Sequence, residues 1–282
     1  MAFNVSKCKL LRITYRKSCK CNFSYRMFCS NASSSAIPNE IFNIAKKQIG
    51  FSMSASDFVI LEEVTSDRYL GVILDNKLNF NKHIDEITNK ATKLLNLCRR
   101  NLHMCSVKTK TLAYHTIVRP HLEYASTCWN PHSKSNIDKI EAVQRRAARF
   151  VLNDYDYSPN CGLSTKIHHI LKWHPLQHRR AVADLCMFYK IRNNLVNIPF
   201  PAIVIQSVKS VDYYKHIQVL RSEAFKYQFF VRGVRLWNTL PHDIILKPSV
   251  SSFRLAVSNW IYPLTWYKDP STNTWVLGRV PL

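Results

Sequence analysis

IDKIEAVQRRAARFVL, residues 137–152, combines an apolar repeat with three arginines in five positions. At about 100° per residue, five apolar side chains fall within roughly a third of the helix circumference. They are Ile140, Val143, Ala147, Phe150 and Val151. Arg145, Arg146 and Arg149 gather on the opposite side, so we expect them to face outward together. The stretch therefore predicts an amphipathic helix whose basic face is either a solvated surface or a contact for phosphates.

Two further helices are expected upstream of this stretch. Between Ile84 and Leu102, apolar residues recur at steps of three and four, which predicts an amphipathic helix of about five turns. A second helix is expected from an N-cap at Ser106 toward Val118, and it should stop before Arg119-Pro120.

Three shorter segments also have helical features. Leu122–Trp129 is expected to form a short apolar helix, ended by Asn130-Pro131. Ser135 and Asp138 have the spacing of a capping box, which would start the helix over 137–152. Residues 171–196 form another helical tract, broken at Pro175.

Strands are expected at both ends of this helical region. FVILEEV (58–64) and RYLGVIL (68–74) are rich in branched and aromatic residues, and they predict a β-hairpin that turns at Thr65-Ser66-Asp67. AIVIQSV (202–208) and QFFVRGVRLW (228–237) are also expected to be extended. The expected fold class is α+β, mostly helical.

The charge of the chain restricts its partners. Forty Lys and Arg oppose eighteen Asp and Glu, a net charge of +22, and residues 81–152 alone hold 13 basic against 5 acidic side chains. A field of this sign concentrates polyanions, so nucleic acid is the expected partner. We expect no membrane contact, because the chain has no run of 18 apolar residues and no basic amphipathic stretch with a large apolar face. We also expect no small-molecule substrate, because the sequence has no P-loop and no Gly-x-Ser-x-Gly elbow.

The counts of nine cysteines and five glycines further restrict the class of protein and its location. An odd cysteine count in a long chain favours reduced thiols and an intracellular location, in the nucleus or the cytoplasm. The first 39 residues contain seven Lys or Arg and no acid, so a mitochondrial transit peptide is the alternative. So few glycines argue against a Gly-rich nucleotide-binding fold.

Six stretches, in this order along the chain, carry a resemblance to a known family. They are FNVSKCKLLRIT (3–14), RYLGVILDNKLNFNKHI (68–84), LCRRNLHMC (97–105), VRPHLEYASTCWNP (118–131), IDKIEAVQRRAARFV (137–151) and FKYQFFVRGVRLWNTLP (225–241). Together they resemble the C-terminal part of the reverse transcriptase, or RNA-directed DNA polymerase, of a jockey-like non-LTR retrotransposon. Residues 16–56 and 262–282 match this pattern poorly.

The resemblance implies a division of the chain into five parts. Expected are a decayed palm remnant with a poorly matched linker (1–57), a palm-edge hairpin like a primer grip (58–80), a thumb-like helical bundle (81–155), a helical region (156–200) and a mixed C-terminal region (201–282).

The same resemblance implies contacts to an RNA–DNA hybrid or a DNA duplex. The residues assigned to them are Arg68, Tyr69, Gly71, Arg99, Arg100, Arg145, Arg146 and Arg149. Gly71 would let a primer backbone approach the hairpin, and Tyr69 would pack on a sugar or base; the alternative is an ordinary strand glycine beside a core tyrosine.

Catalysis is not expected from this chain. Intact enzymes of the family use Mg held by clustered aspartates, but the sequence has no Asp-Asp and no Tyr-x-Asp-Asp. The pairs Glu62-Glu63 and Asp85-Glu86 are adjacent, so their structural interpretation is preferred. We therefore assign no catalytic residue, no metal and no cofactor, and we expect the chain to be inactive as a polymerase by itself.

The cysteines and histidines do not favour a zinc site. The cysteines at 8, 19, 21 and 29 do not have the spacing of a structural zinc site. The histidines at 174 and 178 are four residues apart, a spacing that can bind zinc on a helix, but Pro175 disrupts the turn between them. Three interpretations of the whole chain stay open. The first is a truncated reverse transcriptase with residual, sequence-tolerant nucleic-acid binding. The others are a non-functional genomic remnant and a host-adapted basic nucleic-acid-binding or mitochondrial protein.

Overall fold

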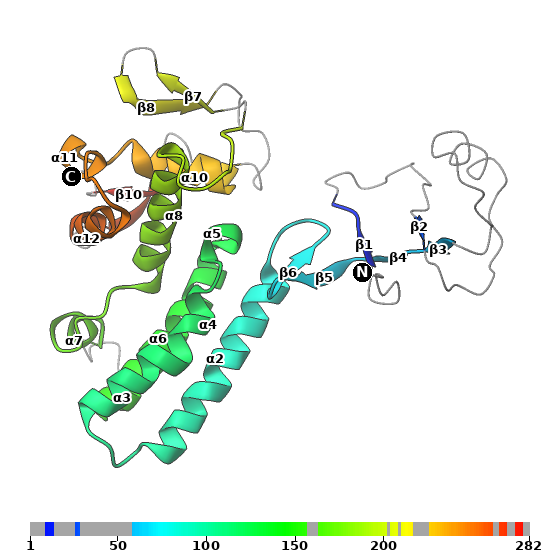
Figure 1. Ribbon diagram of the computed structural model, residues 1–282. Helices are drawn as coiled ribbons and strands as arrows, with labels where there is room; N and C mark the ends of the chain where they lie inside the picture. The colour runs from blue at the N-terminus through cyan, green and yellow to red at the C-terminus, as the bar shows by residue number, and fades with distance from the viewer. Residues whose placement is uncertain are drawn as a thin grey trace, which may run out of the picture. The chain divides into compact units, whose positions relative to one another are not determined.

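The computed structural model describes residues 9–13, 26–28, 58–156, 163–201, 204–207, 210–216, 226–261, 265–269 and 274–278. The chain divides into two compact units, Met1–Phe80 and Asn81–Leu282. The described residues are mostly helical and include five two-stranded sheets, which agrees with the expected class, α+β and mostly helical (Figure 1).

The first unit holds three of these small sheets. Its strands are β1 (Lys9–Leu11), β2 (Arg26–Phe28), β3 (Phe58–Ile60), β4 (Glu62–Val64), β5 (Ser66–Tyr69) and β6 (Val72–Asp75). β1 pairs in parallel with β4, β2 pairs antiparallel with β3, and β5 and β6 form a hairpin.

The expected turn at Thr65-Ser66-Asp67 is wrong. The hairpin pairs Tyr69 with Val72, so its two-residue turn is Leu70-Gly71. Both turn residues have positive φ, 47° and 84°, as a type I′ turn requires. Gly71 is the only glycine between residues 58 and 80, and glycine takes this conformation without a steric penalty, so it decides where the chain reverses.

All the helices within the described residues lie in the second unit. They are α2 (Asn81–Asn101), α3 (Val107–Ala113), the π-helix η3 (Tyr114–Val118), α4 (Arg119–Glu123), α5 (Ser126–Trp129), α6 (Lys134–Leu152), α7 (Leu163–His169), α8 (Leu176–Arg192), α10 (Phe229–Trp237), α11 (His242–Ile245) and α12 (Val250–Ile261). Two antiparallel pairs accompany them: β7 (Val204–Ser207) with β8 (Ser210–His216), and β9 (Thr265–Asp269) with β10 (Thr274–Gly278).

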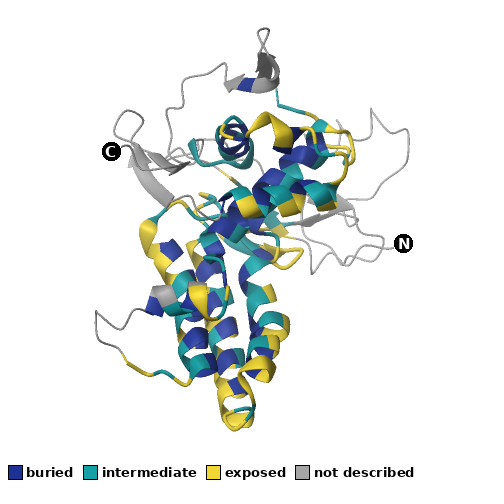
Figure 2. Cartoon of the chain, turned by 90° about the vertical axis from the view of Figure 1, so that its left-hand side faces the viewer, coloured by how far each residue is buried: buried dark blue, intermediate teal, exposed yellow. Residues whose placement is uncertain are grey.

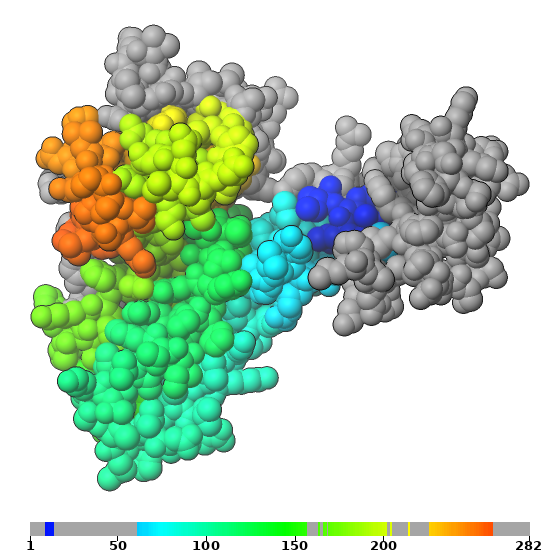
Figure 3. Space-filling model, in the orientation of Figure 1, coloured from blue at the N-terminus to red at the C-terminus, as the bar shows by residue number. Residues whose placement is uncertain are grey.

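α2, α6 and the segment from α3 to α4 pack into a bundle. α2 confirms the helix expected from the apolar repeat, and it buries one stripe that includes Ile84, Ala91 and Leu95. α6 buries the five predicted apolar residues, each at most 2% exposed. Figure 2 shows the buried residues on the sides of these helices that face one another, with exposed residues at the loop between α2 and α3. In the space-filling view the side chains fill the space between these ribbons (Figure 3).

The helix that begins after the Ser106 N-cap does not stop before Arg119-Pro120. Ser106 caps it as expected, accepting a hydrogen bond from the Thr109 N–H. The chain then widens into the π-helical turn η3 and continues as α4, with Pro120 in its first turn. Proline has no N–H and crowds the carbonyl four residues earlier, and the wider turn avoids both problems. The helix ends only near Ala125, whose φ of 51° separates α4 from α5.

The start of α6 also differs from the expectation. Ser133, not Ser135, is the N-cap: its side chain accepts a hydrogen bond from the Asn136 N–H and its backbone is extended. The two serines lie two residues apart, and the local pattern fits either. Asp138 consequently lies inside the helix and is exposed.

The C-terminal half of this unit packs around α8. This helix begins after Pro175, as expected, and it buries residues all around its circumference. QFFVRGVRLW is a helix, α10, and not a strand: Val231, Val234 and Trp237 recur at three-residue steps and bury one face. Packing against α8 decides this, because the branched and aromatic composition alone favours a strand. β7 confirms the strand expected in AIVIQSV.

Candidate nucleic-acid interface

A basic groove lies where the C-terminal halves of α2 and α6 approach α3. It has a volume of about 610 Å³. Five basic side chains line it: Lys93, Arg99, Arg100, His103 and Lys110. The other lining residues are Asn96, Phe150, Asn153 and Tyr155, so none of the described residues that line it is acidic. We call this set the basic groove.

The α-helical repeat of α2 brings several of the groove-lining residues to one side of the helix. Lys93, Asn96 and Arg100 follow one another at steps of three and four, so they form a stripe along one side of the helix, and His103 lies in the turn just after the helix ends. Arg99 and Arg100 occupy the last turn, where the helix dipole favours cations. Lys93, Arg99 and Arg100 are all exposed, so their charges are available to a ligand.

Two aromatic rings form the apolar part of the groove. The Lys110 ammonium lies 5.0 Å from the centre of the Phe150 ring, and this lysine is only 5% exposed. The Arg99 guanidinium lies 5.7 Å from the centre of the Tyr155 ring, and 43% of this tyrosine is exposed. Such cation–π contacts hold the cations in place without neutralising them.

Among the predicted contact residues, Arg99 and Arg100 lie in the basic groove and Arg146 lies beside it. The Arg146 guanidinium donates to Thr92 Oγ1 of α2, at 3.2 Å, and to the Ala142 carbonyl, at 3.3 Å. It is exposed and one helical turn before Phe150, so it extends the positive surface along the line where α2 and α6 meet.

The structure separates Arg146 from the other two arginines of α6, which were expected to face outward with it. Arg145 is half-buried and lines a different cavity of about 230 Å³, together with Asp138, Glu141 and Trp173. Arg149 is half-buried near Asp154. The Lys166 ammonium, and more weakly Arg149, lower the pKa of Asp154. Whether Arg145 and Arg149 contact nucleic acid stays a prediction.

Arg68, Tyr69 and Gly71 lie on the hairpin of the first unit. Arg68 is exposed, Tyr69 is 66% exposed, and Gly71 lies in the turn. The turn conformation by itself accounts for the glycine, while the exposed tyrosine is not a core residue. Their contact with a primer stays a prediction.

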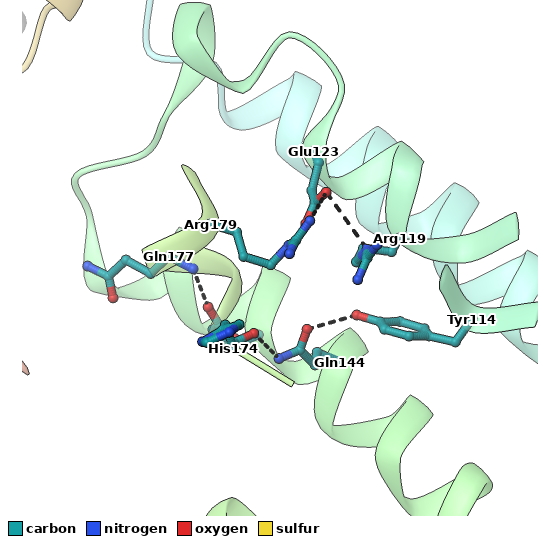
Figure 4. Close-up of polar contacts among 8 residues, drawn as sticks. Tyr114, Arg119, Glu123, Gln144, His174, Gln177 and Arg179 are labelled. Carbon is teal, nitrogen blue, oxygen red and sulfur yellow. Dashed lines mark hydrogen bonds and ion pairs between the residues drawn. The ribbon is translucent and has the colours of Figure 1, made fainter. Parts of the chain in front are cut away.

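A polar network seats the segment before α8 on the bundle (Figure 4). The Tyr114 hydroxyl donates to Gln144 Oε1 at 2.8 Å, and Gln144 Nε2 donates to the His174 carbonyl at 3.0 Å. Arg179 is paired with Glu123 of α4. Burial raises the pKa of Tyr114, which therefore stays a neutral donor.

Sequence reasoning missed most of the basic groove and all of this network. Lys93, Lys110 and Tyr155 belong to three separate segments, and only packing brings them together. Within the described residues no group of three His, Cys, Asp or Glu side chains converges on a possible metal position. The cysteines at 8, 19, 21 and 29 lie outside those residues. No described helix is both long and apolar enough to cross a bilayer.

Part of the chain is similar to two curated transposon proteins of Drosophila melanogaster. A stretch covering 43% of the chain is 28% identical to a probable RNA-directed DNA polymerase from transposon BS, over 124 residues. A stretch covering 33% of the chain is 31% identical to a probable RNA-directed DNA polymerase from transposon X-element, over 102 residues. The matches cover 13% and 11% of these relatives, so the chain corresponds to a small part of their length.

No protein-family model matches the chain, and no solved structure matches it either. The two partial similarities support a reverse-transcriptase-like origin of this sequence.

Proposed function

We propose that this chain is derived from the reverse transcriptase of a jockey-like non-LTR retrotransposon and binds nucleic acid in a sequence-tolerant way. The observation that carries the proposal is the basic groove with Arg146 beside it, where basic side chains gather without an acidic neighbour in the groove lining. Arginines and lysines on rigid helices suit phosphate oxygens, which give affinity but carry no sequence information.

The partner is an RNA–DNA hybrid or a DNA duplex, contacted through its phosphates. In this proposal the bundle formed by α2, α3 to α4 and α6 corresponds to a polymerase thumb, and the β5–β6 hairpin to a primer grip. The chain binds without a cofactor and does not polymerise nucleotides by itself, because the sequence holds no Tyr-x-Asp-Asp.

The salt dependence of binding tests the proposal. Lys93, Arg99, Arg100 and Arg146 are the exposed cations of this surface. If each contacts one phosphate, log affinity should fall with log salt with a slope of about −3.6, at about −0.9 per contact. Affinity for a duplex should then drop about 150-fold between about 50 and about 200 mM salt, and it should change little when the base sequence is changed.

A double variant and a matched control locate the contacts. Arg99→Gln with Arg100→Gln should lower the magnitude of the slope to about 1.8, so that the same salt change costs only about 12-fold. Lys134→Gln with Lys139→Gln removes the same charge from the N-terminal part of α6, about 16 Å or more from Phe150 along the helix axis, and should leave the slope unchanged. Absence of duplex binding by the folded wild type at about 50 mM salt would reject the proposal.

A further inference from the structure

We propose that the basic groove takes an unpaired nucleotide at the end of the bound duplex, so that the protein prefers duplexes with a single-stranded overhang. This inference rests on the proposed function and adds the part of the nucleic acid that enters the groove. The bases of a duplex are stacked and paired inside it, and only its phosphates can reach the rim. An unpaired nucleotide can enter.

The size of the groove suits such a ligand. About 610 Å³ lies within the range of pockets that enclose small molecules, roughly 300–1,000 Å³, and a nucleotide is a ligand of that scale. The exposed cations of α2 line the groove and Arg146 lies beside it. In this proposal they bind the phosphates on either side of the inserted nucleotide.

Tyr155 offers a surface for the base. Its ring is partly exposed, and the Arg99 guanidinium already lies over it. Aromatic rings and guanidinium planes both stack on nucleobases, and stacking is sequence-tolerant because every base has a π-face. The side-chain amides of Asn96 and Asn153 carry donors and acceptors, which suit the edge of any base.

Lys110 adds a reason for an anion inside the groove. Only 5% of this lysine is exposed, and its ammonium lies over the Phe150 ring. Among the described residues no carboxylate pairs with it. A buried ammonium without a counter-charge is costly, and a phosphate brought in with the unpaired nucleotide would supply the missing charge. The groove is therefore more than an exposed basic face.

Competition binding at one salt concentration tests the inference. The probes are a short blunt DNA duplex, the same duplex with a few unpaired thymidines at one end, and the unpaired strand alone. We expect the overhang to bind roughly ten-fold more tightly than the blunt duplex, the size expected for one stacked base. Equal affinity of wild-type protein for blunt and overhanging duplex would overturn the inference.

Substitutions inside the groove assign the preference to it. Tyr155→Ala should bring the ratio of overhang affinity to blunt-duplex affinity close to one, whereas Tyr155→Phe should keep the roughly ten-fold ratio because the ring remains. Lys110→Met, checked for folding by thermal unfolding, should also reduce the preference. An undiminished preference in Tyr155→Ala would contradict the assignment. Loss of all binding by the wild type would instead contradict the proposed function, so the two failures are distinguishable.

Discussion

The buried ion pair between Asp184 of α8 and Arg232 of α10 offers a quantitative test of what holds the C-terminal half together. Asp184 is fully buried, and its Oδ2 accepts hydrogen bonds from Arg232 Nε at 3.1 Å and from Asn130 Nδ2 at 2.9 Å. Arg180, 1% exposed, donates to the same asparagine at 3.0 Å. One carboxylate therefore lies close to the fully buried guanidinium group of Arg180 and to the partly buried guanidinium group of Arg232.

Asp184→Asn keeps the volume of the side chain and removes its charge. Arg180 then stays buried, and Arg232 partly buried, without that carboxylate, and breaking a buried pair in this way costs about 3–5 kcal/mol. At about 2–4 °C per kcal/mol for a unit of this size, the melting temperature should fall by about 10 °C.

Urea unfolding followed by circular dichroism measures the loss. Asp138→Asn is the matched control, because Asp138 is exposed on α6, and it should change the free energy of unfolding by no more than about 0.5 kcal/mol. In an Arg232→Met background, Asp184→Asn should cost at least about 1 kcal/mol less than in the wild type. The reasoning is refuted if Asp184→Asn costs under about 1 kcal/mol, or costs the same in both backgrounds.

Two other predictions follow from packing and titration. Gly233→Ala would place a methyl group 2.7 Å from Phe188 Cδ2, and Phe188 is fully buried. We expect a net destabilisation of about 1 kcal/mol, although alanine has the better helix propensity. A raised midpoint of urea unfolding would contradict this prediction. Burial, together with the charges of Arg119 and Arg179, lowers the pKa of His115 to about 4. The unfolded chain therefore binds more protons than the folded chain between about pH 6.5 and 4. The free energy of unfolding should fall by about 2 kcal/mol as the pH is lowered through this window, after allowing for the partial exposure of the histidine. His115→Phe, which keeps a ring beside Trp173, should flatten this part of the stability profile, and an unchanged profile would show that other groups cause it.

The helices of the bundle could be predicted because their information is local. The apolar repeats of α2 and α6 are complete within one segment, and so are the Ser106 cap and the break at Pro175. Four local patterns failed where two outcomes were both allowed. The hairpin turned at Gly71, and Ser133 rather than Ser135 capped α6. Pro120 was accommodated by a π-helical turn, and residues 228–237 became helical through contact with α8.

The sequence by itself determined the positive charge, the amphipathic helices and the order of segments that resemble a reverse transcriptase, because each depends on residue type and spacing along the chain. Only the tertiary structure decided which charges act together. It joined Arg99 and Arg100 with Lys110 and Tyr155, and it turned Arg145 away from Arg146 toward Glu141. The physical reason is that a groove arises where three helices cross, and the crossing is set by the packing of their buried faces rather than by any one of their sequences.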